Sequence, residues 1–277
     1  SNNAEAYNNM GNTLQEMFKF DEAIKSYEQA IKLNPDYTQA YSNMGNALRG
    51  QGNLNEAIIL YSRAISLKPD YADAYCNMGN TFQEMDKFEE ALKSYEQAIK
   101  LNPNFAEAYY NKGLTLRSLG NFEEAVLKYS KALELKPDYA EAYSDMGNAL
   151  QDQGKLEEAI RAYNKSILLK PNYAEAYFNI GIARQAQGNL VSAIDSYNKA
   201  LINKTDYAEA HNNMGLALQE MGEYEKAIMS CKKALSINPN YAEAYNNMGI
   251  VLHHQGKIEE SIESYNKSIL LKPNYAR

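Results

Sequence analysis

A glycine recurs at every thirty-fourth residue of this 277-residue chain, without exception. The set is Gly11, Gly45, Gly79, Gly113, Gly147, Gly181, Gly215 and Gly249. A fixed period of this length indicates a repeat architecture, in which each unit packs on its neighbours and no central core is needed. We predict eight repeats, spanning residues 4–37, 38–71, 72–105, 106–139, 140–173, 174–207, 208–241 and 242–275. Positions are numbered from 1 within each repeat, so that Ala4 is position 1 and the recurrent glycine is position 8.

Each repeat has the pattern of two helices. Apolar residues at positions 3, 4, 7, 10 and 11 have the spacing of an amphipathic helix. Glycine at position 15 in six repeats predicts the end of this first helix, and proline at position 32 predicts the end of the second. The second helix carries an apolar stripe, which in the first repeat is Ala23, Ile24, Tyr27, Ala30 and Ile31. Asp or Asn at position 33, with Gln or Glu three residues later in most repeats, predicts a capping box.

The combination of an aromatic residue at position 4, Gly at 8, Ala at 20, Tyr at 24, Ala at 27 and Pro at 32 resembles the tetratricopeptide repeat family. The resemblance covers essentially the whole chain. It implies an all-α fold, a right-handed α-solenoid of eight helix-turn-helix hairpins in a single array over 4–275. In the family the first helices line the concave face and the second helices the convex face. The resemblance therefore implies a non-enzymatic scaffold for protein–protein interaction.

The composition narrows the class of partner and the compartment. The chain has 23 Tyr, of which 21 lie at positions 4, 24 or 34, so we interpret them as packing residues. A net charge of -7 disfavours nucleic acid. No apolar run long enough for a membrane span and no signal peptide is apparent. The two cysteines, Cys76 and Cys231, form no disulfide framework, and we expect an intracellular, cytoplasmic or nuclear protein.

No pattern of catalytic or metal-binding residues is present. Of the three histidines, His211 replaces the tyrosine of position 4, and His253 and His254 are adjacent on a helix and cannot face one another. We therefore expect no enzymatic activity, no metal site and no cofactor.

Asparagine is the candidate for function. Position 6 is Asn in seven repeats and Asp in one, and position 9 is Asn in four, although Asn is unfavourable inside helices. In the family, positions 2, 5, 6, 9, 12 and 13 face the groove. The resemblance thus implies a ladder of amides that could bind the backbone of an extended peptide, because an amide both donates and accepts hydrogen bonds. The candidate residues are Asn9, Asn12, Asn43, Asn46, Asn77, Asn80, Asn111, Asp145, Asn148, Asn179, Asn213 and Asn247. The alternative is that they are consensus residues that bond to neighbouring helices.

Two further expectations concern the ligand. The later repeats replace the position-9 amide by apolar residues, which predicts an apolar part of the groove formed by Phe178, Ile182, Leu216 and Ile250. Chaperone-binding members of the family hold a terminal carboxylate with cations at positions 2, 5 and 6. Here position 2 is acidic or Gln and position 6 is never basic, so we expect no clamp for a Glu-Glu-Val-Asp tail.

Two alternative functions remain open. The ladder resembles that of the repeat arm of O-GlcNAc transferase, so the chain could be the substrate-recognition arm of a similar enzyme with its catalytic part absent. The repeats begin and end in phase, which would fit a fragment of a longer protein. The last predicted helix would also support end-to-end self-association through Ile262, Tyr265, Ile269 and Leu270.

Overall fold

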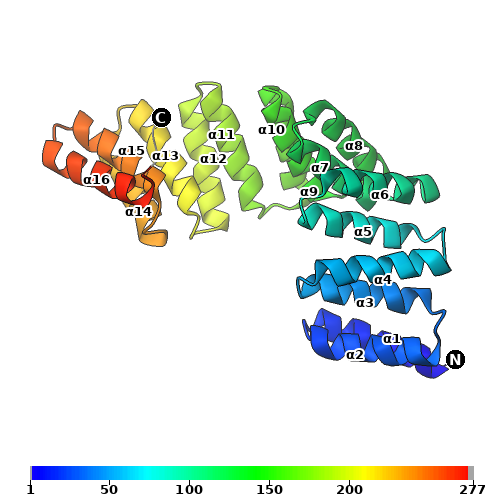
Figure 1. Cartoon of the computed structure of the whole chain (residues 1–277). Coiled ribbons are helices and arrows are strands. Elements are labelled where there is room, and N and C mark those ends of the chain that lie inside the picture. The colour runs from blue at the N-terminus through cyan, green and yellow to red at the C-terminus, as the bar shows by residue number, and fades with distance from the viewer. Residues whose placement is uncertain (1, 274–277) are drawn as a thin grey trace. The chain divides into compact units, whose positions relative to one another are not determined.

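The computed structural model describes residues 2–273, and this part of the chain consists of sixteen α-helices joined by short turns (Figure 1). The helices are α1 Asn2–Glu16, α2 Phe20–Leu33, α3 Thr38–Gly50, α4 Leu54–Leu67, α5 Ala72–Glu84, α6 Phe88–Leu101, α7 Ala106–Ser118, α8 Phe122–Leu135, α9 Ala140–Asp152, α10 Leu156–Leu169, α11 Ala174–Ala186, α12 Leu190–Asn203, α13 Ala208–Glu220, α14 Tyr224–Ile237, α15 Ala242–His254 and α16 Ile258–Leu271. The last two residues of the eighth predicted repeat, 274 and 275, lie outside the described residues.

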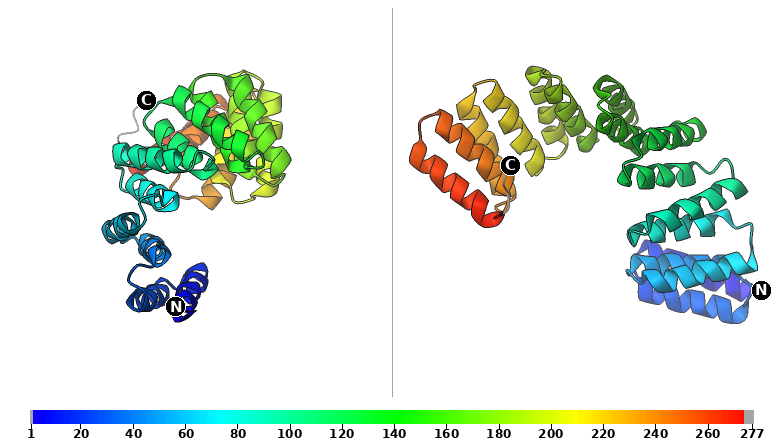
Figure 2. Two further views of the ribbon diagram at one scale, coloured as in Figure 1. Left: turned by 90° about the vertical axis from the view of Figure 1, so that its right-hand side faces the viewer. Right: turned by 45° about the horizontal axis from the view of Figure 1, so that its top comes forward.

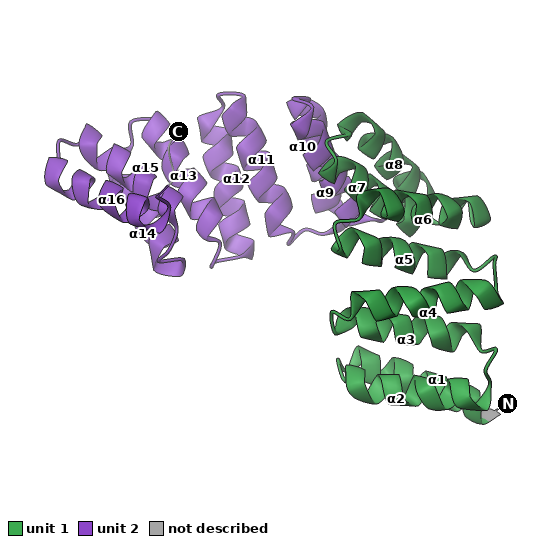
Figure 3. Ribbon diagram, viewed as in Figure 1, with its two compact units in different colours: residues 1–137 green, residues 138–277 purple. Residues whose placement is uncertain are grey.

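Consecutive helices pack in pairs, one pair to each repeat (Figure 2). The odd-numbered helix is the first helix of a repeat and the even-numbered helix is the second. The predicted all-α solenoid of eight helical hairpins is confirmed. The hairpins belong to two compact units, residues 1–137 with α1 to α8 and residues 138–277 with α9 to α16 (Figure 3).

Within each unit the contacts between helices are asymmetric. A first helix contacts the first helix of the next repeat, as α1 contacts α3 and α9 contacts α11. A second helix also contacts the following first helix, as α2 contacts α3. Among the described residues of either unit, no two second helices contact one another. The first helices are therefore closer together than the second helices, so each unit curves with its first helices on the inner face.

The turn inside each hairpin adopts the left-handed conformation at position 15. All six glycines at this position have φ between 72° and 82°, and Phe18 and Asp86 occupy the same position with φ of 58° and 56°. Every second helix from α2 to α14 ends at position 30, two residues before the position-32 residue, which is proline in all of them but α12. The predicted ends of both helices are confirmed, because these signals act through the local backbone.

We expect that replacing Asp86 by glycine stabilises the protein by about 1 kcal/mol, because an L residue at positive φ is strained and glycine is not. Denaturant unfolding followed by circular dichroism measures the change. Gly120→Asp is the matched control, and it should lower the free energy of unfolding by a similar amount. A destabilised Asp86→Gly variant would show that the aspartate side chain is needed at this turn.

The predicted capping box is wrong. The residue before each first helix from α3 to α15 is the aromatic residue of position 34, and its side chain makes no capping hydrogen bond. The position-33 residue lies in the preceding turn, where for example the Asp36 backbone N–H donates to Asn34 Oδ1 (3.2 Å). Because the helix begins one residue later than the capping box requires, the Gln or Glu of position 2 is not at the third helical position.

The core of each hairpin is a tyrosine ring that lies against a glycine. The tyrosines of position 24 in repeats 1 to 6 are completely buried. A methyl group added to the position-8 glycine of the same repeat would lie 2.4–2.7 Å from the nearest ring atom. In these repeats the glycine therefore leaves room for the tyrosine ring. In repeat 7 the partner of Gly215 is Cys231.

Candidate functional site

The position-9 asparagines are bonded to the buried tyrosines of their own repeats. Each tyrosine hydroxyl donates to the side-chain oxygen of the asparagine, over distances of 2.8–2.9 Å. The pairs are Tyr27 with Asn12, Tyr61 with Asn46, Tyr95 with Asn80, and Tyr163 with Asn148. The tyrosine thus holds one end of the amide in place from below the groove surface.

Several position-6 asparagines join their own repeat to the one before it. Their side-chain nitrogens donate to the position-9 oxygens of the preceding repeat over 2.9–3.0 Å, in the pairs Asn43 with Asn12, Asn111 with Asn80, and Asn179 with Asn148. Two also donate to position-5 amides, Asn43 to Asn8 and Asn247 to Asn212, both at 3.0 Å. These are the bonds to neighbouring helices that the alternative interpretation expected, and they offset the local cost of asparagine within a helix.

The network leaves one side of several amides open. The oxygens of Asn12 and Asn80 each accept from two partners, and the oxygen of Asn46 accepts from Tyr61. In the described part of the chain, the side-chain nitrogens of these three asparagines donate to no protein atom at hydrogen-bond distance. All three side chains are half-buried. In the first three repeats, position 9 thus presents a row of N–H donors on the inner face.

The remaining ladder residues vary. Asn9 is exposed, and Asn77 and Asn213 are half-buried. In the fifth repeat the Asn148 side-chain nitrogen donates to Asp145 within the same helix (3.2 Å). Its donor is therefore used internally, unlike those of the first three repeats.

Four of the five glutamines of position 12 belong to the same network, and this role was not recognised from the sequence. Their side-chain oxygens lie 2.8–3.3 Å from the position-24 hydroxyls, in the pairs Gln15 with Tyr27, Gln83 with Tyr95, Gln151 with Tyr163, and Gln185 with Tyr197. The sequence pattern that could have indicated this role is the recurrence of long polar residues at position 12, which is Gln in five repeats and Arg in two, Arg49 and Arg117. Position 12 is one of the groove positions of the family, so a row of long polar side chains there could have been noted beside the asparagines.

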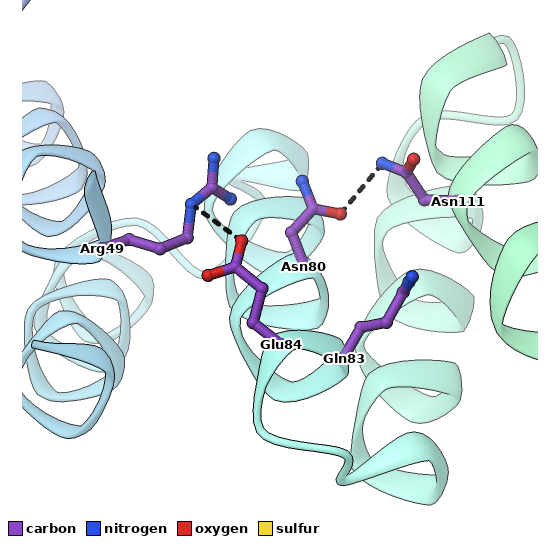
Figure 4. Close-up of a pocket in the computed structure, with 5 residues that line it drawn as sticks. All are labelled: Arg49, Asn80, Gln83, Glu84 and Asn111. Atoms are coloured by element: carbon purple, nitrogen blue, oxygen red, sulfur yellow. Dashed lines mark hydrogen bonds and ion pairs between the residues drawn. The ribbon is translucent and has the colours of Figure 1, made fainter. Parts of the chain in front are cut away.

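Two hollows lie over the first and third repeats, and both use equivalent positions. The first, of about 430 Å³, is lined by Asn12, Gln15, Glu16, Phe18 and Asn43. The second, of about 260 Å³, is lined by Arg49, Asn80, Gln83, Glu84 and Asn111 (Figure 4). Positions 9, 12 and 13 of one repeat and position 6 of the next contribute to both. The polar ladder therefore lines concave surface within residues 1–137.

The apolar candidates of the later repeats lie partly in the core. The Phe178 ring packs on the rings of Tyr197 and Tyr207, with centroid distances of 5.9 and 4.9 Å. Ile182 packs on the cluster that contains Tyr197 and Ala217. Leu216 and Ile250 are half-buried.

Position 5, to which Phe178 belongs, is largely an interface between helices. Its residues Asn8, Ser42, Cys76, Ser144 and Asn212 are at most 5 % exposed. The assignment of position 5 to the groove, carried over from the family, does not hold for these five residues.

The described residues offer neither a cluster for a metal ion nor a membrane-spanning helix. No cluster of three or more His, Cys, Asp and Glu side chains could hold a metal ion there. None of the helices described is long and apolar enough to cross a membrane.

Family comparisons agree with the architecture. A tetratricopeptide repeat model matches residues 4–37, 72–105, 208–241 and 242–275. A second repeat model, described as TPR repeat, matches 45–86, 113–154, 147–188 and 183–222, and a third, described as tetratricopeptide repeat, matches 26–59 and 94–126. The comparison with curated proteins gave no match.

Solved structures with similar folds include two with appreciable sequence identity. MamA is 30% identical, with 58% of this chain and 94% of MamA covered and a TM-score of 0.54. YrrB, described as a TPR protein with an unusual peptide-binding site, is 26% identical, with 66% of this chain and 95% of YrrB covered and a TM-score of 0.56. The Cut9–Hcn1 hetero-tetramer of the APC/C is 18% identical over 96% of this chain and 52% of the matched chain, with a TM-score of 0.66, and shows the fold alone. On the evidence of its helices, its recurrent packing residues and these matches, the chain belongs to the tetratricopeptide repeat family.

Proposed function

We propose that the protein is a scaffold that binds an extended peptide segment of a partner protein along the inner face of its first helices. The observation that carries the proposal is the row of side-chain N–H donors at Asn12, Asn46 and Asn80, which have no acceptor among residues 2–273. Peptide carbonyl groups are acceptors of the kind that such donors bind. The internal bonds of each asparagine oxygen hold its nitrogen in place before a ligand arrives, which reduces the entropic cost of binding.

The family comparisons support this proposal at a coarser level. Repeats of this class form curved stacks whose inner surfaces bind other proteins. YrrB is described as having a peptide-binding site, and it matches two thirds of this chain. The proposal excludes a clamp for Glu-Glu-Val-Asp tails, because position 2 of every repeat is acidic or Gln.

The alternatives have less support. End-to-end self-association would use α16, on which Ile262, Ile269 and Leu270 are 55–80% exposed. A role as the recognition arm of a glycosyltransferase-like enzyme would use the same groove, and peptide binding is the part of that role that this chain could perform.

The experiment is to weaken the donors without breaking the network. In the double variant Asn12→Asp/Asn46→Asp, the side-chain oxygens still accept from Tyr27 and Tyr61, whereas the donors towards the groove are lost. Peptides are first selected on the wild-type protein from a random-sequence display library, and their dissociation constants are then measured by titration calorimetry. Because each lost hydrogen bond is worth about 0.5–1.5 kcal/mol, we expect the double variant to bind about tenfold more weakly.

The control carries the same added charge elsewhere in the same unit. Asn55→Asp/Asn121→Asp places two carboxylates at the starts of second helices, where negative charge is favourable. This control should bind the selected peptides with wild-type affinity. The absence of any selected peptide, or equal weakening of binding in the two double variants, would contradict the proposal.

The double variant Ile182→Asn/Leu216→Asn tests the apolar candidates. We expect it to lose affinity only for peptides with apolar side chains.

A further inference from the structure

The guanidinium of Arg49 makes no hydrogen bond to any residue that the structure describes. It lies in the last turn of α3, and its side chain is 27% exposed. Its Nε atom is 3.6 Å from Glu84 Oε1, which is an ion pair but longer than a normal hydrogen bond. Its Nη1 atom is buried and has no hydrogen-bond partner in the described residues. Unpaired donors of a largely buried charged group are unfavourable, so the exposed part of this guanidinium would gain from an added acceptor, although Nη1 itself is closed to a ligand.

The neighbouring amides also present donors. The Asn80 oxygen accepts from Tyr95 (2.8 Å) and from Asn111 (2.9 Å). The Gln83 oxygen accepts from Thr115 (2.8 Å) and lies 3.1 Å from the Tyr95 hydroxyl. Both oxygens thus accept hydrogen bonds within the protein, whereas neither side-chain nitrogen donates to another described residue. Figure 4 shows the nitrogen of Asn80 turned towards Arg49 and away from Asn111.

Glu84 supplies the acceptor of the same hollow. Its side chain is 49% exposed, and its charge balances that of Arg49. The hollow therefore combines three sets of N–H donors with one carboxylate. A bound carboxylate would meet the repulsion of Glu84, and a bound ammonium would meet Arg49. An apolar side chain would leave all these groups unpaired.

A carboxamide fits both parts of the hollow. Its oxygen can accept from Arg49 and Asn80, and its nitrogen can donate to Glu84. The volume of about 260 Å³ is smaller than that of pockets for drug-sized ligands, about 300–1,000 Å³, and suits a single side chain.

We propose that this hollow, lined by Arg49, Asn80, Gln83, Glu84 and Asn111, is a subsite for the side-chain carboxamide of Gln or Asn in the bound segment. This inference rests on the proposed peptide-binding function and gives it a side-chain preference at one point. The hollow over repeat 1 has the equivalent Asn12, Gln15 and Glu16 but no arginine among its lining residues. We therefore expect the preference for a carboxamide at the hollow over the third repeat and not at the hollow over the first.

The test uses small probes, so that it does not depend on an extended peptide. N-acetyl methylamides of Gln, Asn, Glu and Ala are titrated into the ¹⁵N-labelled full chain. The side-chain N–H signals of Arg49, Asn80 and Gln83 are followed by NMR. The Gln or Asn probe should bind most tightly, the Glu probe more weakly, and the Ala probe, which offers only backbone amides, most weakly. Equal binding of the Ala probe, tighter binding of the Glu probe, or no change in these signals would overturn the inference.

Two variants and one control identify the groups responsible. Arg49→Gln introduces the residue that five other repeats have at position 12. It should weaken binding of the Gln probe about tenfold, because hydrogen bonds to a charged group are lost. Glu84→Gln should weaken binding of the Gln probe and strengthen binding of the Glu probe. Glu16→Gln makes the same change in repeat 1 and should alter the binding of neither probe. If Glu84→Gln strengthened the Gln probe, the carboxylate would not be its acceptor and the inference would fail.

The display selection separates this inference from the proposed function. On the wild-type protein, selected peptides should share a Gln or Asn at one site, and this preference should disappear with Arg49→Gln. Peptides that bind without such a preference would refute the subsite and leave peptide binding intact. Failure to select any peptide would count against the proposed function itself.

Discussion

Adding one methyl group at Gly181 should lower the free energy of unfolding by about 2 kcal/mol. The new Cβ atom would lie 2.4 and 2.5 Å from two ring atoms of Tyr197, which is completely buried. The ring has no space to withdraw, and its hydroxyl is held by Gln185 at 2.8 Å. At an exposed helical position the same substitution would stabilise by about 1 kcal/mol, so the sign of the change is diagnostic.

Repeat 7 offers the matched control for this change. There Gly215 faces Cys231, and a Cβ atom would lie 3.0 Å from the sulfur and 3.3 Å from the Ala227 carbonyl oxygen. Gly215→Ala should therefore cost clearly less than Gly181→Ala. Urea unfolding of both variants and hydrogen exchange in α11 and α12 measure the effects. Equal costs at the two sites would mean that the tyrosine ring is not what requires the glycine.

The second large effect should appear at alkaline pH, where the protein is expected to lose its helices between about pH 10 and 12. Burial raises the pKa of Tyr27 to about 12, and the charge of Glu16 acts in the same direction. Burial likewise raises the pKa of Tyr61 to about 12. The unfolded chain releases these protons near pH 10, whereas the folded chain retains them. The folded state then binds more protons, so stability is full below pH 10 and falls as the pH rises.

The size of this effect follows from the shifts. A difference of two pKa units corresponds to a loss of about 2 kcal/mol for each of these tyrosines at pH 12, rising towards about 3 kcal/mol above it. Burial also raises the pKa values of Tyr95 and Tyr197, which adds to the loss. Ellipticity and tyrosinate absorbance should change together in one cooperative transition.

The double variant Tyr27→Phe/Tyr61→Phe tests the assignment. It should be less stable at neutral pH, because the hydroxyls donate to Asn12 and Asn46, but its stability should fall less steeply above pH 10. Ionisation of every tyrosine near pH 10 without loss of helix would contradict the prediction.

The sequence was sufficient for the features that depend on nearby residues. The glycine period, the position-15 turns and the position-32 prolines predicted the hairpins and their ends, because these signals act within a few bonds of the backbone. The capping box was the local feature that failed, since the helices begin after the aromatic residue of position 34. The burial of the position-24 tyrosines was also predictable from their periodicity.

Only the tertiary structure decided how the asparagines are used. Asparagines that look alike in the sequence have different partners. The Asn80 oxygen accepts from Tyr95, 15 residues away, and the Asn111 nitrogen donates to Asn80, 31 residues away. The Asn80 nitrogen donates to no described residue. Arg49 and Glu84 lie 35 positions apart in the sequence and meet only when α3 and α5 pack. Periodicity determines which residues share a face of a helix. Hydrogen bonding between repeats depends on the distance and direction of side chains on different helices, and these arise only when the helices pack.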